Sequence, residues 1–151
     1  MKVTDQIFAL IHEYKEMEDM IELKDSGSQE IDFKPLFYPR LIEIRRKLSC
    51  LSVELSVEVG KAMRAAKTSK AEYEYQRYMK TKVFMDEGMK VTPAESKAKQ
   101  DIADLLPGLA VDEGVYSSGN FVLKQVNEVL KSLNHDISII KKEYESLTNI
   151  E

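Results

Sequence analysis

The sequence has few of the residues that small proteins use for covalent cross-links and catalytic centres. Its 151 residues include one cysteine, two histidines and no tryptophan. Cys50 therefore cannot form an intrachain disulfide, and a catalytic thiol would need a histidine partner. The two histidines, His12 and His135, fall in predicted helices. We interpret Cys50 as a small buried apolar residue.

The sequence also lacks the short motifs of common enzymes. No GxxxxGK[ST], GxGxxG, CxxC or HExxH pattern occurs, and the Glu-x-x-His pattern of helical di-iron proteins is missing. We interpret the acidic residues near the N-terminus as a solvated helix face. They are Glu13, Glu16, Glu18, Asp19 and Glu22. The sequence thus predicts no enzyme, no cofactor and no metal.

No apolar run approaches the eighteen residues that a membrane span needs. The start of the chain, Met1 to Asp5, lacks the basic region and apolar core of a signal peptide. Charged residues make up 32% of the chain and hydrophobic residues 43%, which is too apolar for a disordered chain. We expect a cytoplasmic protein without a membrane partner, in the host cytoplasm if a phage encodes it.

Apolar residues recur at intervals of three and four, which predicts an all-α fold in one domain, 1–151. The first helix spans 3–24. A loop follows at 25–38, because Pro35 and Pro39 oppose a continuous helix. A long second helix spans 39–87, with Gly60 and 67–70 as places where it can bend or break.

The remaining residues predict two more helices. Thr92 and Pro93 match a helix start, and Pro107-Gly108 matches a turn, which gives a helix over 92–106. A heptad-repeat helix covers 109–147. Its candidate oligomerisation residues are Leu123, Val126, Leu130, Leu133, Ile137, Ile140, Tyr144 and Leu147.

This heptad seam has two interpretations. It packs against the long second helix in an intramolecular hairpin or bundle, or it joins copies of the chain in a homo-oligomer. Two long helices of unequal character leave apolar surface exposed in a monomer, which favours self-association. Both interpretations are compatible with each other.

Charge is segregated along the chain, although the formal net charge is only −4. Residues 1–32 and 100–151 carry net charges of −6 and −5, whereas 33–60 and 61–99 carry +2 and +5. Phosphate contacts depend on local charge, so an acidic protein can still bind nucleic acid through its basic middle.

Within this middle, 61–82 has seven basic residues, two acidic residues and three tyrosines. Such tracks bind single strands without sequence preference, because phosphates attract cations and bases stack on aromatic rings. The predicted nucleic-acid-binding residues are Lys61, Arg64, Lys67, Lys70, Tyr73, Arg77, Lys80 and Lys82. Tyr75 and Tyr78 offer further ring faces. The alternatives are a solvated helix surface with core tyrosines and a protein-docking face.

Three features together resemble the phage recombination-mediator family, the UvsY-type proteins. These are the basic helix with Lys67-Thr68-Ser69-Lys70-Ala71-Glu72-Tyr73, the helix beginning near Thr92, and the C-terminal helix with Leu-Lys-Ser-Leu at 130–133. The resemblance covers about residues 50–147, and the first forty residues have no counterpart. It implies a helical homo-oligomer that binds single-stranded DNA and helps to load a recombinase where a single-strand-binding protein sits. Lys70 is the DNA contact that it implies.

These observations lead to a hypothesis of a non-enzymatic, oligomeric DNA-recombination or replication accessory protein. Its partners would be single-stranded DNA and a recombinase or single-strand-binding protein. The alternative is a structural or protein-interaction module, such as a virion component, an adaptor or an inhibitor of a host system, that does not bind DNA.

Overall fold

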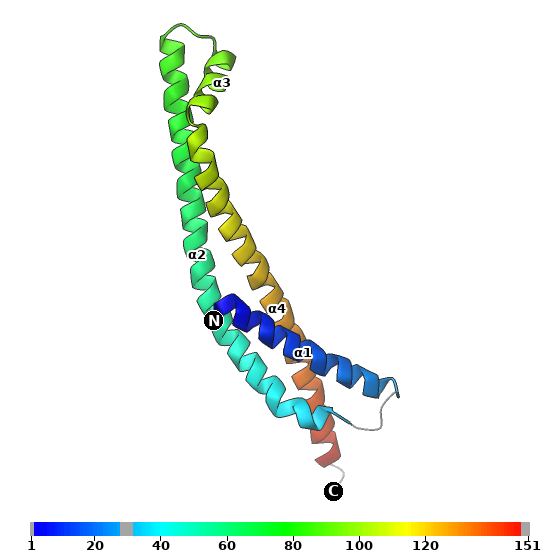
Figure 1. Cartoon of the computed structure of the whole chain (residues 1–151). Helices are drawn as coiled ribbons and strands as arrows, with labels where there is room; N and C mark the ends of the chain where they lie inside the picture. Colours follow the sequence, from blue (N-terminus) through cyan, green and yellow to red (C-terminus); the bar gives the residue numbers. More distant parts are fainter. Residues whose placement is uncertain (1, 28–31, 149–151) are drawn as a thin grey trace. The chain divides into compact units, whose positions relative to one another are not determined.

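The computed structural model describes residues 2–27 and 32–148, and these residues are almost wholly helical (Figure 1). They form α1 (Val3–Asp25), α2 (Lys34–Asp86), α3 (Val91–Asp101), the 3-10 helix η1 (Ala103–Leu105) and α4 (Leu106–Thr148). No strand occurs among the described residues, which confirms the all-α prediction. No described helix contains an apolar stretch of the length and hydropathy that a membrane span requires.

The chain divides into two compact units, where the sequence predicted one domain. The first unit comprises Met1–Ser56 and Phe121–Glu151, and the second comprises Val57–Asn120. Helices α2 and α4 contribute to both units, because each is longer than one core can cover.

In the first unit, α1 packs against the first part of α2 and the last part of α4 (Figure 1). Apolar side chains of all three segments are buried there. They are Ile7, Ile11 and Tyr14 from α1, Leu41, Ile44, Leu48 and Leu55 from α2, and Val122, Val126, Leu133, Ile137 and Ile140 from α4. The spacing of three and four residues in each segment places them on one helical face. The core of this unit is therefore an intrachain three-helix core.

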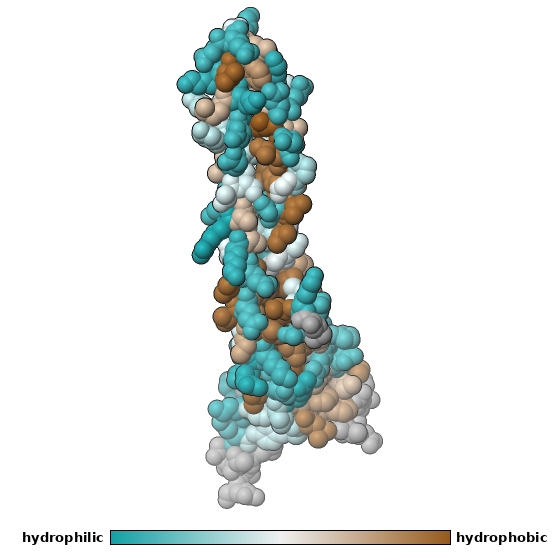
Figure 2. All heavy atoms as spheres, turned by 60° about the vertical axis from the view of Figure 1, so that its left-hand side comes forward, coloured by the Kyte–Doolittle hydropathy of each residue, from teal (hydrophilic) through white to brown (hydrophobic). Residues whose placement is uncertain are grey.

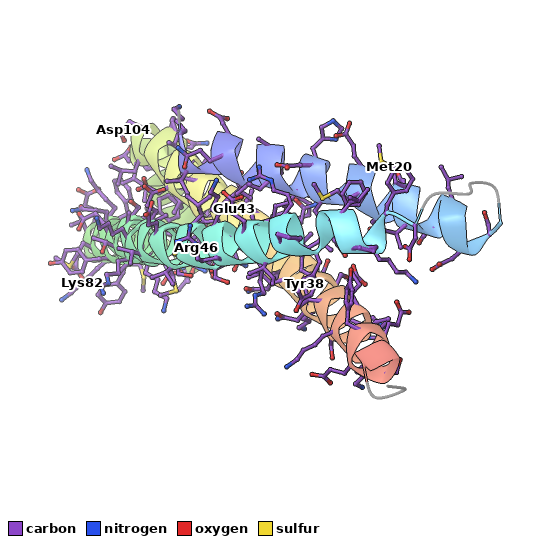
Figure 3. The ribbon with its side chains drawn as sticks, turned by 90° about the horizontal axis from the view of Figure 1, so that it is seen from below. Met20, Tyr38, Glu43, Arg46, Lys82 and Asp104 are labelled. Carbon is purple, nitrogen blue, oxygen red and sulfur yellow. The ribbon has the colours of Figure 1, made fainter. Side chains whose placement is uncertain are left out.

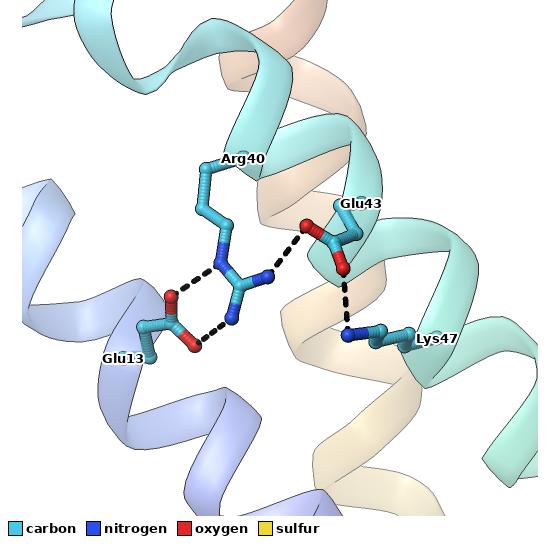
Figure 4. A network of polar contacts seen from close by, with 4 residues as sticks. All are labelled: Glu13, Arg40, Glu43 and Lys47. Carbon is cyan, nitrogen blue, oxygen red and sulfur yellow. Dashed lines mark hydrogen bonds and ion pairs between the residues drawn. The ribbon is translucent and has the colours of Figure 1, made fainter.

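An ion-pair network joins α1 to α2 at the surface of this unit (Figure 4). Arg40 donates from Nε and Nη2 to the Glu13 carboxylate at 2.5 and 2.8 Å, and from Nη1 to Glu43 at 2.5 Å. Lys47 pairs with the other Glu43 oxygen at 2.6 Å. Hydrogen bonding to Arg40 lowers the pKa of Glu13, and hydrogen bonds from Lys47 and Arg40 lower the pKa of Glu43 to about 2.

A second polar contact joins α1 to α4. The Tyr14 hydroxyl lies 2.5 Å from Asp136 Oδ2 and 3.2 Å from Glu18 Oε1, and it donates its single proton to the closer Asp136. Burial raises the pKa of Tyr14, and burial also raises the pKa of Glu18. Glu13 thus makes a contact with another helix, and Glu18 lies beside Tyr14 of its own helix. Both are partly buried, which corrects the interpretation of all the α1 acids as a solvated face.

Helix α2 begins at Lys34, five residues before the predicted start at 39. One backbone amide of its first turn is hydrogen-bonded locally, because the Asp32 carboxylate accepts a hydrogen bond from the Lys34 amide at 3.1 Å. Pro35 lies in that turn, where no intrahelical donor is needed. Pro39 lies inside the helix and removes only the hydrogen bond to the carbonyl of Pro35. The expected loop at 25–38 is shorter for this reason, and α2 continues unbroken through Gly60.

In the second unit, α2 ends in a glycine cap close to the predicted end at 87. Gly88 has a φ of +93°, and its amide donates to the carbonyl of Met85 at 2.9 Å. The Met89 amide donates to the carbonyl of Phe84 at 3.0 Å. This is the Schellman arrangement, in which an apolar contact accompanies the reversal. Met89 packs accordingly against a small core of Phe84, Ala94 and Ala98.

Two predicted boundaries in this unit are shifted. Lys90 is the N-cap of α3, without a side-chain hydrogen bond, so Thr92 lies inside the first turn and does not cap the helix. Pro107 and Gly108 lie in the first turn of α4 and do not end a helix. Proline is tolerated there, because first-turn amides have no intrahelical acceptor. The turn falls instead at Ile102, between α3 and η1.

Candidate nucleic-acid interface

The predicted nucleic-acid-binding residues all lie on α2, within the Val57–Asn120 unit. All seven basic side chains among them are exposed. Lys80 pairs with Asp101 of α3 at 3.5 Å. The other six form no ion pair within the part of the chain that the structure describes. They are Lys61, Arg64, Lys67, Lys70, Arg77 and Lys82. Their charge is thus available to an external anion.

These cations do not share one face of the helix. A step of three residues turns a helix by about 300°, so each successive cation from Lys61 to Lys70 is rotated by about 60°. Lys61, Arg64 and Lys67 lie within about 60° of one direction. Lys70 is rotated beyond that range, and Arg77 is rotated further toward the packed side of α2. The predicted track therefore splits between two sides.

Tyr73 is the residue of the predicted site that the structure places differently. It is half-buried, and it lies nine residues after Arg64, which is about two and a half turns and hence the opposite side of α2. It continues a seven-residue spacing from Val59 and Ala66, both of which are buried. Tyr73 is thus on the packed side of the helix, where it is poorly placed to stack on a base.

Tyr75 and Tyr78, which the sequence offered as further ring faces, lie on the exposed side of α2. Their side chains are 57% and 65% exposed. Arg64 and Tyr75 are about three turns apart, and Arg64 and Lys82 are five turns apart, so they point the same way. We call this side of α2 the aromatic–basic face. It consists of Lys61, Arg64, Lys67, Tyr75, Tyr78 and Lys82.

Contacts on the opposite side of α2 hold this face outward. The Ser69 hydroxyl donates to the Asp112 carboxylate of α4. The Lys97 ammonium of α3 lies 4.3 Å from the centre of the Phe84 ring, a cation–π contact. Figure 3 shows Lys82 and Asp104 on opposite sides of this unit. Asp101 of α3, Asp104 of η1 and Asp112 of α4 thus lie away from the aromatic–basic face.

Few acidic side chains reduce the positive charge of this face. Glu72 and Glu74 lie at its two edges, rotated by about 80° from Arg64 in opposite directions. Glu72 accepts a hydrogen bond from Gln76 at 2.7 Å. Asp86 is aligned with the face but lies beyond Lys82, at the end of α2. Between Lys61 and Lys82 the face itself carries four cations and no acid.

The predicted oligomerisation residues lie on α4 in the first unit. Val126 and Leu133 are completely buried, Ile137 and Ile140 are buried, and Leu123 and Leu130 are half-buried. The Tyr144 ring is 6.2 Å from the ring of Tyr38 on α2. The side chain of Leu147 lies outside the described residues. The buried part of the seam therefore packs inside the chain, as the intramolecular interpretation expects, and its use in self-association stays a prediction.

Cys50 is exposed, which corrects its interpretation as a buried apolar residue. It lines a groove between α1 and α2 with a volume of about 440 Å³. Ala9, Leu10 and Leu51 supply apolar wall, and Arg46 and Lys47 supply positive charge. Cys50 follows Leu48 by two residues, so helical periodicity turns it away from the core that Leu48 enters. No motif in the sequence marks this groove.

Among the described residues, no group of three or more histidine, cysteine, aspartate or glutamate side chains is placed to hold a metal ion. Comparisons with protein-family models, curated proteins and solved structures give no match. The resemblance to phage recombination mediators accordingly stays a prediction from the sequence.

Proposed function

We propose that this chain is a non-enzymatic accessory protein of DNA recombination or replication that binds single-stranded DNA through α2. The observation that carries the proposal is the set of six exposed cations on one helical segment, unpaired among the described residues. Clustered unpaired lysine and arginine bind phosphate by releasing its counterions. The resemblance to recombination mediators supports the same function and a recombinase or single-strand-binding protein as partner.

The proposal includes a role as an oligomeric scaffold. Figure 2 shows hydrophobic residues among the hydrophilic ones at the surface of the chain. Helices α2 and α4 carry several exposed apolar side chains. Val53, Val57, Val111, Val115 and Phe121 are each more than half exposed. Such side chains support self-association outside the buried seam. An assembly would array several weak DNA contacts and raise the overall affinity.

Binding of an unstructured, fluorescently labelled oligonucleotide at 50 and 200 mM salt tests the DNA component. Arg64→Glu/Lys67→Glu should weaken binding and lower the salt slope by about 1.4, because each lost phosphate contact of a single strand contributes about 0.7. Lys124→Glu/Lys131→Glu on α4 changes the net charge equally but lies in the other unit, and it should leave binding nearly unchanged. Absence of binding at low salt, or equal effects of the two double variants, would refute the proposal.

The second candidate is a protein-interaction module that does not bind DNA. The groove between α1 and α2 favours it, because apolar walls together with Arg46 among the lining residues suit an amphipathic segment of a partner. A stoichiometric protein complex that Leu10→Glu abolishes, together with indifference to DNA, would support this candidate over the first.

A further inference from the structure

Two tyrosines of the aromatic–basic face, Tyr75 and Tyr78, lie mostly outside the packing of the chain. Tyr75 and Tyr78 are both more than half exposed, and neither hydroxyl forms a hydrogen bond with a described residue. Tyrosine is an amphipathic residue that is usually packed on one side and hydrogen-bonded at its tip. Burial in the core therefore does not account for two tyrosine rings on an outward face.

The surroundings of these rings indicate an anionic partner. Lys82 follows Tyr78 by four residues and Tyr75 by seven, so its ammonium group lies one and two turns from the rings on the same face. Arg64 and Lys67 lie on the same side at the other end, and about 27 Å of helix axis separates Arg64 from Lys82. Cations thus flank the aromatic pair at both ends.

The spacing of the rings indicates the form of the nucleic acid. Side chains three residues apart on a helix are about 5–6 Å apart at Cβ, which is wider than the 3.4 Å rise between stacked nucleotides. The spacing of the two Cβ atoms therefore differs from that of bases in a regular stack. A single strand can separate its bases to meet them, whereas the bases of a duplex present only their edges.

We infer that Tyr75 and Tyr78 form a base-stacking platform, through which the aromatic–basic face selects single-stranded over double-stranded DNA. The inference rests on the proposed DNA-binding function and adds its specificity. Phosphates bind the flanking cations in either form of DNA, but only unpaired bases gain the stacking contacts. Sequence preference is expected to be small, because every base has a ring face.

The test compares three ligands of equal length by fluorescence anisotropy, namely a single strand, a single strand with abasic sites, and a duplex. The wild-type chain should bind the single strand most tightly. Tyr75→Leu/Tyr78→Leu should weaken binding to the single strand by about 5- to 140-fold per stacked base, and should leave binding to the abasic strand unchanged. The salt slope should stay the same, because the phosphate contacts remain.

Tyr73→Leu is the matched control, because the same substitution two residues away falls on the packed side of the same helix. It should bind all three ligands as the wild type does. Leucine favours the helix, and circular dichroism at 222 nm checks that each variant keeps its helical content.

Three outcomes overturn the inference. Equal binding of normal and abasic strands by the wild type removes the role of the bases. A double tyrosine variant that binds like the wild type, while Arg64→Glu/Lys67→Glu loses binding, refutes the platform but leaves the proposed function intact. If the wild type binds no oligonucleotide and the tyrosine variant instead loses self-association, the face is a protein-docking surface and the proposed function fails as well.

Discussion

Leu133 gives the sharpest test of how the heptad seam is used. Its side chain is completely buried within one chain, in the core of the first unit. Truncation of such a leucine removes its transfer free energy and leaves a cavity, so Leu133→Ala should cost about 2–5 kcal/mol of unfolding free energy. In a chain of this size that corresponds to a decrease in Tm of about 4–20 °C.

Leu36→Ala is the matched control for Leu133→Ala. Leu36 belongs to the same unit but is 66% exposed, so the same substitution there should change the unfolding free energy by less than about 0.5 kcal/mol. Urea unfolding, followed by circular dichroism, measures both variants at several protein concentrations.

The concentration series separates the two interpretations of the seam. If Leu133 packs inside the chain, the cost of Leu133→Ala is the same at every protein concentration. If the seam instead joins copies, the cost of Leu133→Ala changes with protein concentration, and the substitution lowers the molar mass seen by light scattering. That result, or equal effects of the two leucine variants, would refute the intrachain core.

Two further predictions concern a close helix contact and an ion pair. A Cβ at Gly119 would lie 2.9 Å from Val59 Cγ2, whereas a Cβ at Gly114 meets nothing within 4 Å. Gly114→Ala should therefore stabilise the chain by about 1 kcal/mol. Gly119→Ala should be about 1–3 kcal/mol less stable than Gly114→Ala in urea unfolding. Equal stability of the two variants would mean that the Val59 side chain moves away from the new Cβ without an energetic cost. Because Arg40 lowers the pKa of Glu13 below 4.5, this pair stabilises the fold above pH 4.5, and its contribution is lost as pH falls through the lowered pKa. Glu13→Gln should therefore lower the unfolding free energy by about 0.2–1 kcal/mol at pH 7 and by progressively less below pH 4.5. A loss that grows as the pH falls would contradict this pH dependence.

The sequence by itself determined which segments are helical, because the interval between apolar residues is a local property. Ile7, Leu41 and Val126 each belong to such a pattern, and each is completely buried. The end of α2 was equally local, since Gly88 adopts a backbone conformation that other residues avoid. Helix starts were less predictable. Pro39 was expected to begin the helix, but it is accommodated near the start at the loss of one hydrogen bond.

Tertiary structure decided which side of each helix is covered. The sequence of 61–82 contains cations and tyrosines all around the helix, so it cannot tell Tyr73 from Tyr75 until α3 and α4 occupy one side of α2. The eighteen-residue spacing of Arg64 and Lys82 is visible in the sequence, but only the packing of α2 shows that the two side chains point outward. The heptad pattern likewise specifies an apolar face without specifying its partner, because the hydrophobic effect depends on buried area and not on which helix provides the cover.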